Sequence, residues 1–162
     1  MLKICINNIP VLRKKSLFVE NITAQEKTIL EQMLKIMYKS QGVGLAAPQV
    51  GILKQLIVVD VGDGPLKLIN PKIIRKTGKK ITALEGCLSL PEITVKVMRS
   101  KNITVKAQDI NGDLVKIEAT DLFSRALQHE IDHLQGKLII DYLPWLKRIG
   151  LKQKIKKSCH VF

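Results

Sequence analysis

Long apolar segments are absent from this chain of 162 residues, which excludes an ordinary membrane-spanning protein. No apolar run approaches the roughly 18 residues that a transmembrane helix needs. The N-terminal residues also lack the extended apolar region and the small-residue cleavage site that mark a signal peptide. We therefore expect a cytoplasmic protein with no membrane partner.

Cysteine is scarce as well, with only three residues, an odd number that cannot form a disulfide framework. In a reducing compartment, such thiols serve as core residues, reactive groups or metal ligands. Cys5 lies in an apolar run, which indicates a core position. Cys159 stands beside His160 near the C-terminus, and we interpret the pair as part of the tail. Cys87, between a glycine and a proline, stays open as a ligand or an inert thiol.

Aromatic residues make up only 4% of the chain and acidic residues are few, with 14 Asp and Glu against 27 Lys and Arg. The resulting net charge of +13 permits contact with an acidic surface or with nucleic acid. Base recognition by stacking requires aromatic side chains among the basic ones, and this pattern is missing. We expect no sequence-specific nucleic-acid binding and interpret most of the lysines as a solvated surface.

Helical and extended segments follow one another along the chain without a linker or a repeat. Thr23 to Glu26 form a capping box, which opens an amphipathic helix that should end before Gly42. Asn111-Gly112 predicts a β-hairpin turn, and Pro144 precedes a basic helix. Extended segments are expected at residues 55–61, 66–74 (broken by Pro71), 93–97 and 103–107.

This order predicts an α+β fold of antiparallel strands packed around a central helix, with an N-terminal and a C-terminal helix. We expect one catalytic domain over residues 1–162, in which residues 144–162 form the basic C-terminal helix or tail.

The predicted central helix carries an HExxH motif, His129-Glu130-Ile131-Asp132-His133. Residues four apart lie on the same face of a helix, so both imidazoles can bind one metal ion, with Glu130 beside them as a general base. Such a motif also arises by chance on charged helices. The helix offers Thr120 or Asp121 as an N-cap and Gly136 as a C-terminal stop, and its apolar stripe turns the histidines inward. This pattern predicts hydrolysis of a carbonyl compound by metal-activated water.

Two histidines leave a catalytic metal one protein ligand short, since such sites commonly hold three. Asp141 is the nearest downstream candidate, and no glutamate follows the motif. Cys87 is the upstream candidate and would give a Cys-His-His site. The residues by themselves leave both candidates open.

Three motifs stand in one order along the chain: Gly42-Val43-Gly44-Leu45-Ala46-Ala47-Pro48-Gln49, Glu85-Gly86-Cys87-Leu88-Ser89, and the HExxH segment. Together they resemble the hallmark motifs of the peptide deformylases, and the similarity extends from Leu12 to Tyr142. The resemblance implies a metal-dependent hydrolase of protein biosynthesis. Its substrate would be the N-formyl group on the initiator methionine of nascent polypeptides.

The resemblance also implies roles for individual residues. The metal ligands would be Cys87, His129 and His133. The catalytic residues would be Glu130 as general acid and base, with the Gln49 amide and the Leu88 backbone N–H as oxyanion donors. The substrate backbone would bind at Val43, Gly44 and Gly86. The methionine pocket has as candidates Val43, Leu88, Leu122 and Ala126, of which the last two are equally well explained as core residues.

The family typically uses Fe²⁺, and Zn²⁺, Ni²⁺ or Co²⁺ also suit a Cys-His-His site. In some members a C-terminal helix contacts the ribosome, and the basic segment here would do the same; a solvated tail is the interpretation that we favour. Thr94 replaces an arginine that some members carry near the substrate. Arg99 is expected to brace the site by pairing with Glu85 or Asp132.

Two alternatives use the same residues. An HExxH metallopeptidase would cleave internal peptide bonds. A basic structural metal-binding protein that docks on RNA would hold a closed site with four ligands.

Overall fold

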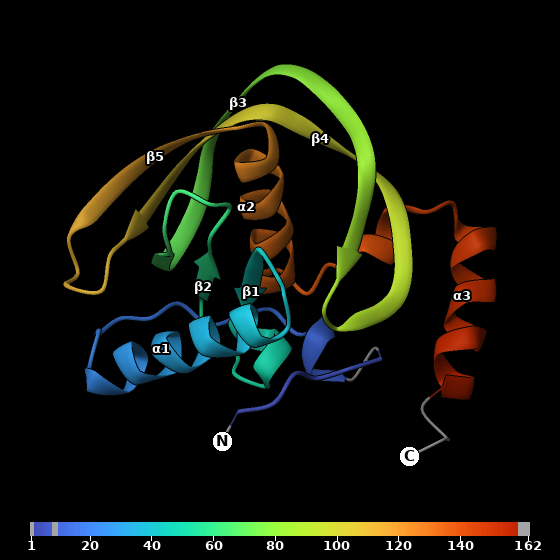
Figure 1. Cartoon of the computed structure of the whole chain (residues 1–162), viewed down its shortest axis with the longest axis horizontal. Helices are drawn as coiled ribbons and strands as arrows, with labels where there is room; N and C mark the ends of the chain where they lie inside the picture. Colours follow the sequence, from blue (N-terminus) through green and yellow to red (C-terminus); the bar gives the residue numbers. More distant parts are fainter. Residues whose placement is uncertain (1, 8–9, 159–162) are drawn as a thin grey trace.

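The computed structural model describes residues 2–7 and 10–158, with side chains up to residue 151 (Figure 1). The helices and strands are α1 (Ala24–Lys39), β1 (Gly44–Ala46), β2 (Leu56–Val59), β3 (Leu66–Cys87), β4 (Leu90–Gln108), β5 (Leu114–Thr120), α2 (Asp121–Leu134) and α3 (Trp145–Ser158). Short 3-10 turns are η1 (Pro10–Arg13), η2 (Ala47–Val50) and η3 (Ile139–Tyr142). Cys159 and His160, predicted to belong to the tail, lie outside the described residues.

The strands form one antiparallel sheet of five strands in the order β1-β2-β3-β4-β5, so every strand pairs with its neighbours in sequence. This arrangement confirms the predicted α+β class. In Figure 1, β3, β4 and β5 arch over α2, and α1 lies at the opposite end of the view.

The strand β2 lies between two layers of apolar side chains, which explains its uninterrupted hydrophobic sequence. Ile57 and Val59 pack into the cluster that includes Ala126 and Leu127 of α2. Leu56 and Val58 pack into a second cluster with residues of α1. A strand that is buried on both faces shows no alternation of polar and apolar residues.

The long hairpin of β3 and β4 differs from the prediction. The expected strand at 66–74 is not broken at Pro71 but continues to Cys87, with a shift of register between Ile69 and Lys72. A β-bulge accommodates a proline, which has no N–H for the ladder. The two short strands expected at 93–97 and 103–107 are likewise parts of the single strand β4. Most of β3 beyond Pro71 is exposed, so its sequence carries little hydrophobic alternation.

The turn between β4 and β5 confirms the predicted hairpin. Gly112 has a φ of 93°, whereas Asn111 is not among the residues with positive φ. The Asp109 carboxylate accepts hydrogen bonds from the N–H groups of Asn111 and Asp113. An Asx-type turn therefore replaces the tighter turn in which both residues would adopt positive φ.

The helix α1 begins with the predicted capping box at Thr23. Its hydroxyl accepts a hydrogen bond from the N–H of Gln25, and the carboxylate of Glu26 accepts one from the N–H of Thr23. The helix ends at Lys39, before Gly42, as predicted. Its buried face includes Leu30, Met33 and Met37.

The helix α2 packs against β4 and also contacts β1, β2 and β5. Thr120 occupies the N-cap position, but its side chain makes no capping hydrogen bond, so the predicted cap is wrong in this respect. The chain instead enters the helix directly from β5, with a φ of 49° at Asp121. The predicted stop at Gly136 is confirmed, since this glycine adopts a φ of 71°. A side chain there would collide with the carbonyl of Arg13.

The segment after α2 leads through buried Leu138, Ile139 and Ile140 to α3. As predicted, α3 follows Pro144. Among the described residues, no helix combines the length and the apolar character that crossing a membrane requires.

Replacing Thr23 by alanine removes the side chain that caps α1. We expect Thr23→Ala to lower the free energy of unfolding by about 1 kcal/mol, because an N–H at the start of the helix loses its acceptor. Urea denaturation of the purified protein measures this change. Thr28→Ala is the matched control: it lies within the same helix, is exposed, and gains helix propensity. Equal destabilisation by both variants would contradict the assignment of the cap.

Candidate metal centre

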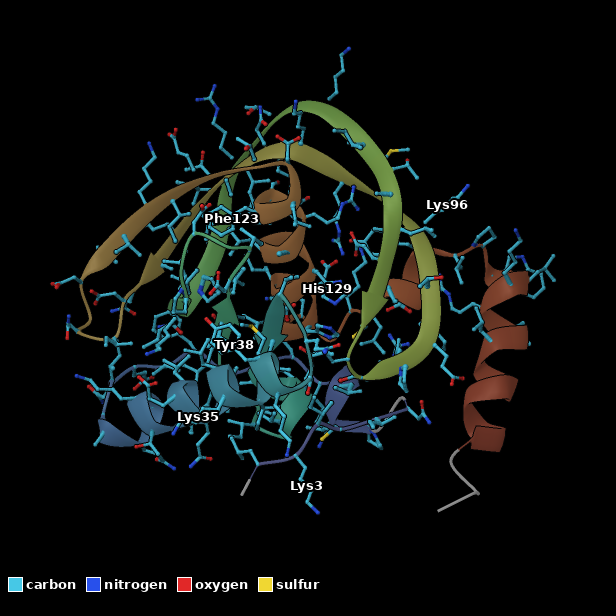
Figure 2. The ribbon with its side chains drawn as sticks, viewed as in Figure 1. Lys3, Lys35, Tyr38, Lys96, Phe123 and His129 are labelled. Carbon is cyan, nitrogen blue, oxygen red and sulfur yellow. The ribbon has the colours of Figure 1, made fainter. Side chains whose placement is uncertain are left out.

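A cavity of about 500 Å³ opens between three segments that are far apart in sequence. Residues 41–44 and Gln49 line one side, residues 84–88 and 90–94 of the β3–β4 hairpin line another, and α2 supplies the third. The same segments carry the three motifs that the sequence singled out. Figure 2 shows His129 in the interior of the molecule, on the side of α2 that faces β3 and β4.

The side chains of Cys87, His129 and His133 converge at this cavity, and their donor atoms all lie within 4.8 Å of one another. Cys87 Sγ is 3.3 Å from His133 Nε2, which is 3.2 Å from His129 Nε2. One turn of α2 separates the two histidines, and the end of β3 supplies the cysteine. One thiolate and two imidazoles suit a tetrahedral metal that keeps its fourth position open.

Asp141, the downstream alternative for the third ligand, lies elsewhere. Its carboxylate pairs with Arg13 at 2.5 Å and accepts a hydrogen bond from the N–H of Leu138 at 2.9 Å. It thus fixes η3 against the N-terminal segment. The tertiary structure brings Cys87, not Asp141, to the two histidines.

The carboxylate of Glu85 ties the hairpin to α2. It receives two hydrogen bonds of 2.9 Å from the guanidinium of Arg99 and one of 2.6 Å from Arg125. His129 Nδ1 lies 3.1 Å from the same carboxylate, which orients the ring so that Nε2 faces Cys87. Glu85 therefore positions His129 as a candidate metal ligand and is not itself a ligand.

Arg99 bridges Glu85 to a second carboxylate, that of Asp132 on α2, at 2.5 Å. The hydroxyl of Tyr142 donates to Asp132 at 2.6 Å and closes the network. The sequence predicted that Arg99 would pair with Glu85 or Asp132, and the structure shows both pairs. Only 4% of Arg99 is exposed, so its ion pair with Glu85 is buried, whereas the pair with Asp132 is partly open to solvent.

The charges in this network shift the pKa values of its members. Burial alone raises the pKa of Glu85, but the hydrogen bonds from His129 and Arg99 outweigh burial and lower the pKa to about 2. Burial lowers the pKa of His129, yet Cys87 and Glu85 outweigh it and raise the pKa to about 10. Burial lowers the pKa of His133 well below its ordinary value. A positive charge is thus favoured on His129 and disfavoured on His133.

Glu130 lies beside the ligands, and burial raises its pKa to about 7. Its Oε2 is buried and has no hydrogen-bond partner in the described part of the chain. Gly44 packs directly against this side chain, because a Cβ at that position would collide with Glu130 Oε1. A carboxyl group in such an apolar, confined setting can accept and return a proton near neutral pH.

Gln49 is buried with its amide held in one orientation. Its Oε1 accepts a hydrogen bond from the N–H of Ala46 at 2.8 Å, and its Nε2 lies 3.5 Å from Cys87 Sγ. The N–H₂ group therefore points toward the candidate metal centre. Leu88, the other predicted oxyanion donor, follows Cys87 and lines the same cavity.

The predicted substrate-binding residues also line this cavity: Val43, Gly44, Gly86, Leu122 and Ala126. Val43 and Leu122 are exposed, whereas Ala126 is buried and also belongs to the apolar core. Thr94 lies at the same opening.

Arg125 and Tyr142 belong to the network but were missed at the sequence level. Arg125 lies one helical turn before His129, a spacing that places both on one face of α2 and offered a usable signal. No such spacing connects Tyr142 to the motifs, since η3 brings it into place through tertiary contacts.

Comparison with known proteins reveals extensive similarity. The family model described as Polypeptide deformylase matches residues 1–148. A peptide deformylase of Alkaliphilus metalliredigens is 52% identical over 132 residues, which span 82% of this chain and 89% of the relative. The crystal structure of peptide deformylase from Thermotoga maritima matches with a TM-score of 0.86 and 46% identity, covering 89% of this chain and 98% of that one. A peptide deformylase from Ehrlichia chaffeensis in complex with actinonin matches with a TM-score of 0.94 and 35% identity, covering 99% of both chains.

Removing the guanidinium of Arg99 leaves the buried carboxylate of Glu85 and the partly exposed one of Asp132 with one cation fewer. We expect Arg99→Ala to lower the free energy of unfolding by about 3–5 kcal/mol. We also expect lower metal content per chain, because Glu85 would no longer be fixed beside His129. Urea denaturation and elemental analysis after metal reconstitution measure the two effects.

Arg75→Ala, at an exposed position of β3, is the control and should change neither quantity. Arg99→Lys keeps the charge without the two-pronged hydrogen bond, so it should fall between the wild type and Arg99→Ala. Normal metal content in Arg99→Ala would show that Arg99 does not brace the site.

Proposed function

The chain belongs to the peptide deformylase family, and from that premise we infer that it removes the N-formyl group from the initiator formyl-methionine of nascent polypeptides. The products are formate and a free N-terminal amine. One observation carries this conclusion: the family match spans the sheet and α2, and Cys87, His129 and His133 converge beside Glu130 within it. An internal peptidase and a closed structural metal site have no comparable support.

We propose that Cys87, His129 and His133 hold one divalent cation. The donor set fits, because one thiolate and two imidazoles offer their donor atoms within 4.8 Å of one another. The bound cation supplies Lewis acidity at the substrate carbonyl and a hydroxide nucleophile at neutral pH. We propose Fe²⁺ as the native ion, since the family typically uses it, with Zn²⁺, Ni²⁺ and Co²⁺ as substitutes.

Glu130 moves the proton in this scheme. Its carboxylate takes a proton from the attacking water and delivers it to the nitrogen of the leaving amine as the formyl C–N bond breaks. A pKa raised to about 7 supports both halves of this transfer, because the proton is neither held too tightly nor released too early. The close approach of Gly44 keeps the carboxylate from swinging away.

Gln49 and the backbone N–H of Leu88 are proposed as donors to the oxyanion that develops on the formyl oxygen. The hydrogen bond from Ala46 N–H to Gln49 Oε1 supports this role, since it turns the amide N–H₂ group toward Cys87 Sγ and the cavity. A donor that is oriented before the reaction needs no rearrangement as charge develops. Removing one such donor typically costs roughly 3–4 kcal/mol of barrier height.

We propose that the peptide binds as an added strand along Val43, Gly44 and Gly86. Two observations support this. The strand β1 lies at the edge of the sheet, so its outer side can pair with a substrate. No atom lies within 4 Å of a Cβ position built on Gly86, which leaves room for a peptide backbone.

The methionine side chain is proposed to enter the apolar part of the cavity, formed by Val43, Leu88, Leu122 and Ala126. Leu122 and Ala126 share the face of α2 that carries His129 and line the cavity with it. The spacing of four residues between Leu122 and Ala126 supports this arrangement.

Several broader features remain proposals. Residues 1–162 would act as one catalytic domain in which α2 is the central helix. Because the substrate is a nascent chain, we propose a cytoplasmic location. Ribosome contact through α3 stays a prediction; Trp145 and Leu146 are exposed at its start, and its side chains beyond residue 151 are not described.

Replacing Glu130 tests the catalytic assignment. We expect Glu130→Gln to retain its metal and to lose activity by at least about 100-fold, because the amide cannot take the proton from water. The measurement is formate release from formyl-Met-Ala-Ser by protein purified without oxygen and loaded with a defined metal. Glu118→Gln, an exposed position on β5, is the control and should keep full activity. Persistent turnover by Glu130→Gln would contradict the mechanism.

The proposed pocket recognises methionine mainly through its apolar surface. We therefore expect formyl-norleucine peptides to react with a kcat/KM within about tenfold of the methionine substrate, since an apolar pocket discriminates weakly between side chains of similar size. Formyl-aspartate peptides, which place a charge in the pocket, serve as the control and should react far more slowly. Equal rates for all three would exclude a side-chain pocket at this site.

A further inference from the structure

A row of three lysines crosses the sheet at one position of its register. Lys72 of β3 pairs with Lys106 of β4, which in turn pairs with Lys116 of β5. All three are exposed. Residues that pair directly across antiparallel strands have Cα atoms about 5 Å apart, so the three side chains leave the sheet next to one another.

The row lies on the outer face of the arch, away from α2. The next position along each strand contributes an apolar side chain to the cluster beneath the sheet, namely Ile73, Val105 and Ile117. Successive side chains of a strand point to opposite faces, so the lysines face solvent. Figure 2 shows side chains with nitrogen at their tips extending outward from this arch.

The surrounding outer face is also basic. Arg75, which lies opposite Thr104 in the register, is exposed, as are Lys76, Lys79 and Lys80 further along β3. On β4, Lys96 is exposed like Lys106, whereas Arg99 is buried beneath the sheet and Lys101 pairs with Asp121. Glu118 pairs with Lys116 at 3.6 Å, and both side chains are largely exposed. Within the described residues, Lys72 and Lys106 form no ion pair.

This row does not serve the stability of the sheet, because like charges directly opposite one another destabilise strand pairing. The apolar side chains on the inner face supply the packing of these strands. A cluster of cations whose one acidic partner, Glu118, is itself largely exposed is instead complementary to an external polyanion. The three ammonium groups sit on flexible stems, which lets each reach a separate anionic group.

We propose that the outer face of β3, β4 and β5, centred on Lys72, Lys106 and Lys116, binds the phosphate backbone of double-helical RNA. The choice of RNA rests on the proposed function, because a nascent chain is made on a ribonucleoprotein particle. Contact here would leave the cavity free, since the row lies on the other side of the sheet from α2.

The neighbours of the row favour a nucleic-acid backbone over other anionic surfaces. The outer face of the arch carries no aromatic side chain, which excludes base stacking and excludes the aromatic anchors typical of a membrane surface. Binding of this kind recognises the duplex through its backbone, without sequence preference.

Binding of a labelled RNA hairpin, with a stem of about 16 base pairs, tests the proposal. Fluorescence anisotropy is measured over a series of salt concentrations for the full chain and for the triple variant Lys72→Gln/Lys106→Gln/Lys116→Gln. We expect the variant to bind at least about tenfold more weakly at low salt, with a salt slope reduced by about 2 to 3, since each lost phosphate contact lowers the slope by about 0.9.

The control variant Lys27→Gln/Lys35→Gln/Lys39→Gln removes three exposed lysines of α1 and carries the same net charge. It should bind RNA within about twofold of the wild type. Equal weakening by both variants would show that net charge alone attracts RNA and would overturn the proposal. No weakening by the row variant would overturn it as well, as would a selective loss of binding to phosphatidylserine vesicles with unchanged RNA binding.

Formate release from formyl-Met-Ala-Ser is measured on the same variants. Both should retain it, which shows that the fold and the metal centre are intact. This readout depends on the proposed function and not on the lysine row, so a failure of one proposal can be told apart from a failure of the other.

Discussion

The buried carboxylate of Glu85 is the contact on which the metal centre depends. It lies near the end of the long hairpin and joins two guanidinium groups to the imidazole of His129 on α2. A buried carboxylate is unfavourable unless its charge is compensated and its oxygens are hydrogen-bonded, and here both conditions are met. The same contact fixes the hairpin to the helix and orients a metal ligand, so stability and chemistry share one group.

The hairpin explains how distant segments supply one site. Cys87 pairs with Leu90 where β3 turns into β4, while Glu85 pairs with Val95 two residues earlier. The register shifts between these two residues, and both side chains reach α2: the Glu85 carboxylate lies 3.1 Å from His129 Nδ1 and Cys87 Sγ lies 3.3 Å from His133 Nε2. The bulges along β3 bend the pair of strands into the arch that brings their end to the helix. A straight hairpin of this length would carry Cys87 away from the histidines.

The sheet divides its tasks between its two faces. The inner face packs apolar side chains against α2 and carries the buried polar network at one end. The outer face is exposed to solvent and carries charged side chains, among them the row of Lys72, Lys106 and Lys116. Because alternate residues of one strand serve the two faces, the chemistry inside and the charge outside can change independently of each other.

Local patterns in the sequence determined the features that depend only on residues close to one another along the chain. The capping box at Thr23, the helical spacing of His129 and His133, and the glycine stop at Gly136 depend on neighbours along the chain, and the structure contains all of them. The three motifs were sufficient to identify the family. Tertiary structure decided what depends on the register between distant strands: Cys87 instead of Asp141 beside the histidines, and a single hairpin in place of shorter strands. Tertiary structure also brings Tyr142 into the network around Asp132 and aligns Lys72, Lys106 and Lys116 across the sheet. The spacing of residues along one helix or strand can be read from the sequence, whereas the pairing between helices and strands depends on how the whole core packs.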